Sequence, residues 1–172
     1  MNGANNIVLI GMPAAGKSTL GVLLAKATGR SFLDTDVHIQ AREGRTLQRI
    51  LAQEGVAGFR RIEEQGVLAL ECRDTVIATG GSVVYGEGAM EHLKAGGIVV
   101  YLQLPLSVLA RRIKDFARRG VVMSADQTLA DLLAERDPLY RRYADVTVDC
   151  RARTHEEVLG RVLETLQRNA KS

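Results

Sequence analysis

Short runs rich in apolar residues recur along the chain, and each is followed by a stretch in which apolar residues return at helical spacing. Because strand alternates with helix throughout, the pattern favours a parallel sheet joined by right-handed crossovers. We therefore predict one α/β domain over residues 1–172, with a five-stranded parallel sheet and helices on both faces in three layers. The five strands are expected at 7–10, 31–34, 75–78, 97–102 and 146–149.

Glycine, proline and threonine divide the helical stretches. Gly29 is a stop signal for the first helix, Gly44 and Gly55 predict breaks in a long helical segment, and Thr46 is placed to open one of its pieces. Pro138 should interrupt or bend the helix in which it lies. The expected helical stretches are 17–28, 37–73, 90–95, 106–114, 128–143 and 154–166. Residues 115–126 have no period and are basic, which predicts a mobile lid or a solvated connector.

The first apolar run leads directly into the spacing G-x-x-x-x-G-K-[ST]. A loop of this kind between a strand and a helix turns backbone N–H groups inward around an anion, and the helix dipole adds to the field. Lys17 would reach the β- and γ-phosphates, and the Ser18 hydroxyl would coordinate Mg²⁺. We therefore predict a nucleoside-triphosphate site formed by Gly11, Pro13, Ala14, Ala15, Gly16, Lys17, Ser18 and Thr19.

Two carboxylates, Asp34 and Asp36, follow the second predicted strand, at the edge where open α/β sheets bind ligands. Such residues often only cap the next helix. Beside a phosphate loop, however, Mg²⁺ and a substrate hydroxyl both favour carboxylate oxygen. Gly80 and Gly81 follow the third strand, where they would allow a ligand to contact the backbone or simply form a tight turn.

An arginine and two glutamates lie at helical spacing in FRRIEE. The simple interpretation is a surface ion pair worth less than ~1 kcal/mol. The alternative is that Glu63 orients Arg60 to receive a substrate anion.

Composition limits the possible functions only loosely. The net charge of +3 is too weak to indicate nucleic acid by itself, although 18 of the 23 basic residues are arginine, the side chain suited to carboxylate and phosphate. The two cysteines form no metal-binding or disulfide pattern, and neither a signal peptide nor a membrane-spanning run is expected. We predict a cytoplasmic protein without nucleic-acid or membrane partners.

Four motifs together resemble the shikimate kinase family of P-loop kinases, and the similarity extends from about Asn6 to Leu166. The motifs are GMPAAGKST, DTD at 34–36, FRRIEE and ERDPLYRRYA. The resemblance implies ATP and Mg²⁺ as cofactors and phosphorylation of shikimate to shikimate 3-phosphate, a step of aromatic amino-acid biosynthesis. It also implies that Asp34 holds Mg²⁺ through water, that Asp36 contacts the acceptor hydroxyl, and that Arg60 and Arg136 bind the substrate carboxylate.

The same resemblance assigns three arginines to the nucleotide side. Arg112 would lie against adenine, Arg119 in the lid would meet the transferring phosphate, and Arg153 would contact the nucleotide. Lys17, Asp36 and Arg119 are then the predicted catalytic residues, and Gly80, Gly81 and Ser82 line the acceptor pocket. The protein is expected to act as a monomer.

The chain departs from the family pattern at three places. Ser82 replaces a third glycine, the lid reads Arg119-Gly120-Val121-Val122 instead of Arg-Pro-Leu-Leu, and His155 stands where a proline often packs near adenine. Because Ser82 brings a side chain toward the acceptor pocket, a kinase of another small hydroxy acid such as homoserine is the main alternative. A nucleotide-binding regulator without catalysis is the second.

Overall fold

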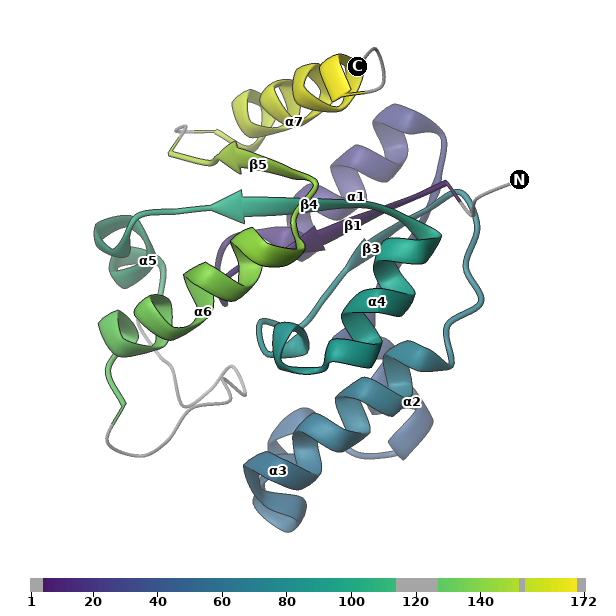
Figure 1. The fold of residues 1–172 in the computed structure, drawn as a ribbon, viewed down its shortest axis with the longest axis vertical. Coiled ribbons are helices and arrows are strands. Elements are labelled where there is room, and N and C mark those ends of the chain that lie inside the picture. The colour runs from purple at the N-terminus through teal and green to yellow at the C-terminus, as the bar shows by residue number, and fades with distance from the viewer. Residues whose placement is uncertain (1–4, 114–126, 152–153, 170–172) are drawn as a thin grey trace.

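The computed structural model describes residues 5–113, 127–151 and 154–169, which form an α/β fold around a five-stranded parallel sheet (Figure 1). The strand order is β2-β3-β1-β4-β5, so the predicted five-stranded parallel sheet is confirmed. The strands are β1 (Asn6–Ile10), β2 (Ser31–Asp34), β3 (Thr75–Ala78), β4 (Gly97–Gln103) and β5 (Val146–Asp149).

The first strand lies at the centre of the sheet, paired with β3 on one side and β4 on the other. In its register, Val8 lies opposite both Ile77 and Val99. Val8 is fully buried, as expected of a central strand that helices cover on both faces. This position fixes the loop that follows β1 at the middle of the sheet edge.

Helices cover both faces of the sheet. Helices α1 and α7 contact each other on one face, while α3, α4 and α6 lie on the other (Figure 1). The helices are α1 (Lys17–Thr28), α2 (Thr35–Glu43), α3 (Leu47–Leu68), α4 (Glu87–Gly96), α5 (Leu106–Arg112), α6 (Leu129–Tyr143) and α7 (His155–Asn169), and η1 (Val83–Tyr85) is a short 3₁₀ helix.

Most of the predicted helix ends and breaks lie at the residues that the sequence indicated. Gly29 and Gly44 end α1 and α2 with left-handed backbone, and Thr46 caps α3 by accepting a hydrogen bond from the next turn. Gly55 has a φ of 67° and interrupts the helical geometry of α3. The sequence therefore located these boundaries through residues whose conformational preferences are strong.

The observed helices differ from the predicted ones in several places. Helix α3 ends at Leu68 rather than near residue 73, and α4 begins at Glu87 rather than at Met90. Helix α6 runs through Pro138 without interruption. The proline removes one backbone donor, but the Thr128–Asp131 capping box and the buried face of α6 support the helix around it.

A second, smaller apolar cluster joins α2 to α3 outside the main core. It consists of Ile39, Ile50 and Phe59, all of which are buried. This cluster gives the helical segment beyond the sheet its own internal support, so side chains on its inner face are held in place.

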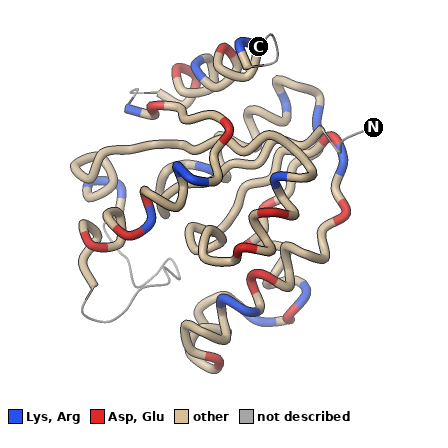
Figure 2. Tube along the Cα trace, viewed as in Figure 1, with Lys and Arg blue, Asp and Glu red and all other residues tan. Residues whose placement is uncertain are grey.

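Charged residues of both signs are interspersed along the helices (Figure 2). In the described ranges, none of the helices is both long and apolar enough to cross a membrane.

Candidate active site

The carboxyl ends of β1, β2 and β3 bring the predicted motifs to one edge of the sheet. The phosphate loop follows β1, Asp34 ends β2, and Gly80 comes two residues after β3. Because the strands are parallel neighbours, these segments meet at a single site even though they are far apart in the chain.

The phosphate loop has the backbone geometry that the motif predicts. Gly16 has a φ of 92° and provides no side chain to cap α1, so the first N–H groups of that helix remain available to an anion. A Cβ on Gly11 would lie 2.8 Å from the Leu102 carbonyl oxygen, which explains why only glycine fits there. Ala14 adopts a φ of 62°, where a glycine would be less strained.

Lys17 lies folded over the loop in which it occurs. Its ammonium donates hydrogen bonds to the carbonyl oxygens of Gly11 at 2.8 Å and Met12 at 2.9 Å. Burial lowers the pKa of Lys17 to about 8, against the opposing effect of the Asp36 charge. A cation thus lies at the centre of the loop that would hold phosphate.

The two predicted magnesium ligands contact each other. The Ser18 hydroxyl donates to Asp34 Oδ2 at 2.6 Å, while Asp34 Oδ1 accepts from the backbone N–H of Asp36 at 2.9 Å. Asp34 therefore caps α2 and also turns one oxygen toward the phosphate loop. This pair of hard oxygen donors fits Mg²⁺, which is bound by few protein ligands together with waters and phosphates.

Asp36 lies half-buried at the start of α2. Burial and, to a smaller extent, the nearby Asp34 carboxylate raise its pKa to about 6, and the Lys17 charge opposes both. A carboxyl group with this pKa is largely ionised at neutral pH and remains basic enough to accept a proton.

The two glycines after β3 lie within a crowd of site residues. A Cβ on Gly80 would lie 2.4 Å from Glu63 Oε1 and 2.9 Å from Asp36 Oδ1. A Cβ on Gly81 would lie 2.9 Å from Pro13 Cδ and 3.0 Å from Arg136 Nη1. The backbone of this turn therefore touches the phosphate loop, α2, α3 and α6 at once, which only side-chain-free residues permit.

One cavity of about 300 Å³ joins these segments. Its wall contains Lys17 from the phosphate loop, Asp36 from α2, Ser82 from the turn after β3, and Arg136 from α6. Arg136 is almost completely buried, with 1% of its surface exposed. A buried guanidinium in a cavity is a strong site for an anion because little water competes for it.

Arg60 lies next to this cavity rather than in its wall. It lines an adjacent cavity of about 180 Å³, which shares Glu63 and Ser82 with the first. Its guanidinium stacks on the ring of Tyr85, 3.7 Å from the centroid. The sequence predicted Arg60 beside the site, but it did not predict the aromatic partner.

Glu63 does not brace Arg60 as predicted. Ion pairs among the described residues do not include these two side chains, and Glu63 Oε2 instead accepts a hydrogen bond of 2.6 Å from the Ser82 hydroxyl. Burial raises the pKa of Glu63 to about 7, and the Ser82 hydrogen bond acts in the opposite direction. Ser82 replaces a glycine of the family pattern. Its hydroxyl thus binds the Glu63 carboxylate, which was expected to hold Arg60.

The predicted nucleotide-side residues are only partly described. Arg112 donates to the Ala14 carbonyl oxygen at 3.5 Å, and a small cavity beside the loop is lined by Gly16, Arg112 and His155. Arg119, Arg153 and the predicted lid at 115–126 lie outside the described residues.

Four residues near the site were not predicted from the sequence. Leu47 and Phe59 line the cavity from α3, Tyr85 lies under Arg60, and the Tyr140 hydroxyl donates to the Gly81 carbonyl oxygen at 2.6 Å. The sequence contains only a weak indication that Tyr85 lies at the site: it is an aromatic residue four positions after Gly81. In the sequence, Leu47, Phe59 and Tyr140 are indistinguishable from ordinary core residues.

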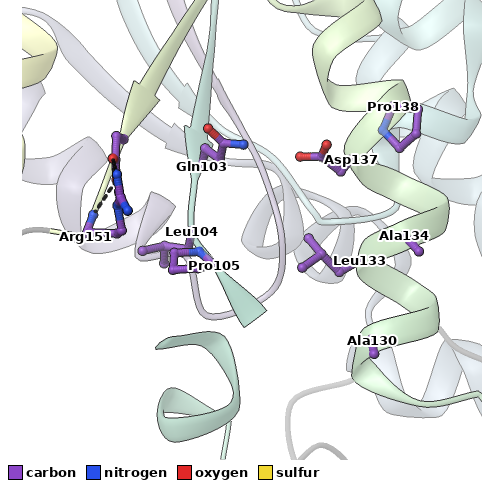
Figure 3. A pocket seen from close by; sticks show the side chains of 10 residues that line it. Gln103, Leu104, Pro105, Ala130, Leu133, Ala134, Asp137, Pro138 and Arg151 are labelled. Carbon is purple, nitrogen blue, oxygen red and sulfur yellow. Dashed lines mark hydrogen bonds and ion pairs between the residues drawn. The ribbon is translucent and has the colours of Figure 1, made fainter. Parts of the chain in front are cut away.

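A separate cavity of about 560 Å³ lies between α6 and the carboxyl ends of β4 and β5 (Figure 3). Leu104, Leu133 and Asp137 are among its lining residues, and none of the predicted site residues belongs to it. The predicted chemistry is therefore concentrated in the smaller and more polar cavity.

Comparisons with known proteins agree on one family. The family model for shikimate kinase matches residues 13–167. The shikimate kinase of Halorhodospira halophila is 42% identical over 95% of this chain and 94% of its own length, and that of Mycobacterium avium is 43% identical with the same coverage. The solved structure of shikimate kinase from Acinetobacter baumannii in complex with shikimate has a TM-score of 0.87 and 35% identity, covering 96% of this chain and 94% of that one.

A phosphate loop after the central strand of a 2-3-1-4-5 parallel sheet defines a P-loop kinase. With most of its length matched by one family model and by relatives more than 40% identical, the chain belongs to the shikimate kinase family. It is an enzyme of phosphoryl transfer in the shikimate pathway, and its family membership implies the use of ATP.

Proposed function

We propose that this protein transfers the γ-phosphoryl group of ATP to a hydroxyl of shikimate, giving shikimate 3-phosphate and ADP. The observation that carries the proposal is that Lys17, Asp36 and Arg136 line one cavity, although they come from three distant segments. The relative solved with shikimate at 35% identity supports this choice of acceptor.

The nucleotide half of the site would use the loop of residues 11–19. Its backbone N–H groups and Lys17 would bind the phosphates, with Arg112 on the adenine side. Ser18 and Asp34 would hold Mg²⁺, which supplies neutralisation of charge on the phosphate oxygens. Arg119 and Arg153, assigned by family resemblance, would complete this half.

The acceptor half would bind the acid at both of its functional ends. Arg136 and Arg60 would bind the carboxylate, since guanidinium and carboxylate form paired charge-assisted hydrogen bonds. Gly80, Gly81 and Ser82 would border the ring of the acceptor. Asp36 would orient the reacting hydroxyl and accept its proton, and its pKa of about 6 suits that role at neutral pH.

The remaining parts of the proposal concern the whole molecule. We propose that the protein works as a single-domain monomer in the cytoplasm. Gel filtration with light scattering tests the oligomeric state, and a mass twice that of the chain would contradict it.

A coupled assay of ADP release tests the activity. Purified protein is mixed with Mg²⁺ and ATP and then given shikimate, homoserine or no acceptor. A rate that saturates with shikimate and stays at background with homoserine is expected. Release that depends on homoserine alone would replace the proposed acceptor, and nucleotide binding without any acid-dependent release would favour the regulator.

Ser82→Gly separates the acceptor alternatives further. If shikimate is the acceptor of the natural site, this variant should retain shikimate activity within about 5-fold, because the Ser82 hydroxyl bonds to Glu63 and a hydrogen bond of this kind contributes ~1 kcal/mol. A large gain of shikimate activity in Ser82→Gly would instead indicate that the natural protein serves another acid.

A further inference from the structure

A single aromatic ring lies against both arginines that are proposed to bind the acid. The Arg60 guanidinium carbon is 3.7 Å from the centroid of the Tyr85 ring, and that of Arg136 is 5.2 Å away. Arg136 Nε also donates a hydrogen bond of 3.2 Å to the Tyr85 hydroxyl. Two cations from α3 and α6 therefore meet at one residue of η1.

The hydroxyl of Tyr85 is fixed from a second side. It donates to Glu135 Oε1 at 2.5 Å, and Glu135 also accepts from Gln127 at 2.6 Å. With its proton directed to Glu135, the phenolic oxygen presents a lone pair to Arg136. The orientation of the ring is thus set by polar contacts as well as by packing.

Arg60 depends on the ring more than Arg136 does. The Nε atom of Arg60 is buried and has no hydrogen-bond partner among the residues that the structure describes, and Glu63 bonds to Ser82 instead. A guanidinium that is placed over an aromatic face gains ~0.5–2 kcal/mol, increasing as water is removed. In this protein the Tyr85 ring, rather than a carboxylate, therefore holds the Arg60 guanidinium in place.

We infer that Tyr85 is a positioning residue of the acceptor site, which holds Arg60 and Arg136 together so that one substrate carboxylate binds to both. The inference rests on the proposed function, because it concerns the carboxylate of the acid that the site accepts. Tyr85 does not line the cavity of about 300 Å³ that contains Lys17 and Asp36, and it would not touch the reacting atoms. Its loss should therefore weaken binding of the acid and leave the rate at saturation nearly unchanged.

Kinetics of Tyr85→Leu and Tyr85→Phe test this role. Tyr85→Leu removes both the ring and the hydroxyl, and we expect the KM for shikimate to rise about 10-fold, as the loss of two cation–π contacts would give. The KM for ATP and kcat should change by less than about 2-fold. Tyr85→Phe keeps the ring and loses only the bond to Arg136, so its KM for shikimate should rise by about 3-fold.

The chain offers a matched control in Tyr143. Its ring also lies under an arginine, with the Arg142 guanidinium carbon 5.3 Å from the centroid, but Arg142 is a surface residue with 64% of its side chain exposed. Tyr143→Leu should leave both KM values unchanged. A similar rise in the KM for shikimate in this control would show that loss of a tyrosine stacked on an arginine away from the site has the same effect, and would overturn the inference.

Several outcomes contradict the role of Tyr85. They are a wild-type KM for shikimate in Tyr85→Leu, equal increases in both KM values, or equal damage from Leu and Phe. If a thermal melt shows that Tyr85→Leu is unfolded, the same kinetics are measured on Tyr85→Met. If both variants are unfolded, the ring serves the fold alone and the inference is wrong. Wild-type protein without acid-dependent ADP release would contradict the proposed function, whereas normal turnover with an unaffected Tyr85→Leu contradicts only this inference.

Discussion

The phosphate-binding half of the cavity comes from consecutive residues 11–19, whereas the acid-binding half is assembled from α3, η1 and α6. In the first half the loop's own lysine makes local contacts, the hydrogen bonds from Lys17 to Gly11 and Met12, although Arg112 reaches Ala14 across 98 positions. In the second, Arg136 meets Tyr85 across 51 positions of the chain, and Ser82 meets Glu63 across 19. A local loop thus forms the centre of the nucleotide side, whereas the acceptor side has no such continuous segment and depends on tertiary packing throughout.

The two halves also differ in how their charges are buried. Lys17 is surrounded by backbone carbonyl oxygens that any sequence with this loop would supply. Glu63 has one buried oxygen without a hydrogen-bond partner among the described residues, and burial raises its pKa to about 7. The acceptor half is therefore the part where substitutions should alter specificity, and the phosphate half the part where they should abolish turnover.

Lys17→Met should have the largest effect. Without a cation at the phosphate loop, charge on the transferring group loses its stabilisation, and kcat should fall by ~10³-fold or more while the protein remains folded. ADP-release kinetics and a thermal melt measure both quantities. Lys94→Met, at a half-exposed ion pair with Asp145, is the control and should be active. Phosphate transfer near the wild-type rate in Lys17→Met would mean that the loop has another role.

Arg136→Ala should come next. Loss of a charge-assisted pair with the acid is worth ~1.5–3 kcal/mol, so the KM for shikimate should rise about 10- to 100-fold with little change in that for ATP. Arg60→Ala should act in the same direction. Arg141→Ala removes an arginine of the same helix that pairs with Asp137 at the surface, and it serves as the control. If both substrates bind equally weakly to Arg136→Ala, the arginine maintains the fold rather than the acid site.

The pH profile of kcat/KM should show two limbs. Asp36 acts as a carboxylate, and since its pKa is raised to about 6, activity should fall about 10-fold per pH unit below that value. Lys17 acts as a cation with a pKa lowered to about 8, so activity should also fall above pH 8. Initial rates between pH 5 and pH 9 in buffers of constant ionic strength measure the profile. A flat profile on the acid side would remove Asp36 as the proton acceptor.

Glu63→Gln should give a smaller effect, on stability. The pKa of Glu63 is raised from 4.5 in the unfolded chain to about 7 in the fold, so its favourable contribution is complete below pH 4.5 and is lost as pH rises through 7. An uncharged glutamine avoids that loss, and the variant should be more stable than wild type at pH 8 by ~1–3 kcal/mol. Denaturant unfolding at pH 5 and pH 8 measures the difference. Glu71→Gln, at an exposed position, should leave the pH dependence of wild type unchanged, and a Glu63→Gln variant that behaves like this control would contradict the prediction.

The sequence predicted the fold and the phosphate half because their signals are local. Alternating strands and helices imply the parallel sheet, and one loop motif implies the position of Lys17 at its centre. Ser18 and Asp34 meet because α1 begins, and β2 ends, at the same edge of the sheet. Glycine and threonine signals likewise located the ends of α1 and α2 and the start of α3.

In the acceptor half, the sequence predicted which residues take part but not which residues they contact. Arg60, Glu63 and Arg136 were identified, yet Glu63 bonds to Ser82 and Arg60 stacks on Tyr85. These pairings depend on how α3, η1 and α6 pack together, and no periodicity or motif within one segment encodes that packing. The end of α3 was misplaced for the same reason: residues 69–73 contain four strong helix formers, yet the carbonyl oxygens of Leu70 and Cys72 bond to side chains of distant segments, His92 and Asn6.

The central claim is that the phosphate-binding half and the acid-binding half face each other across one cavity. A crystal structure with ADP, Mg²⁺ and shikimate tests this claim most directly. The proposed function predicts that the Arg136 guanidinium hydrogen-bonds the shikimate carboxylate and that an Asp36 oxygen lies within ~2.6–3.2 Å of the hydroxyl facing the nucleotide phosphates. Shikimate bound with its carboxylate away from Arg136, or with no hydroxyl near Asp36, would contradict that prediction.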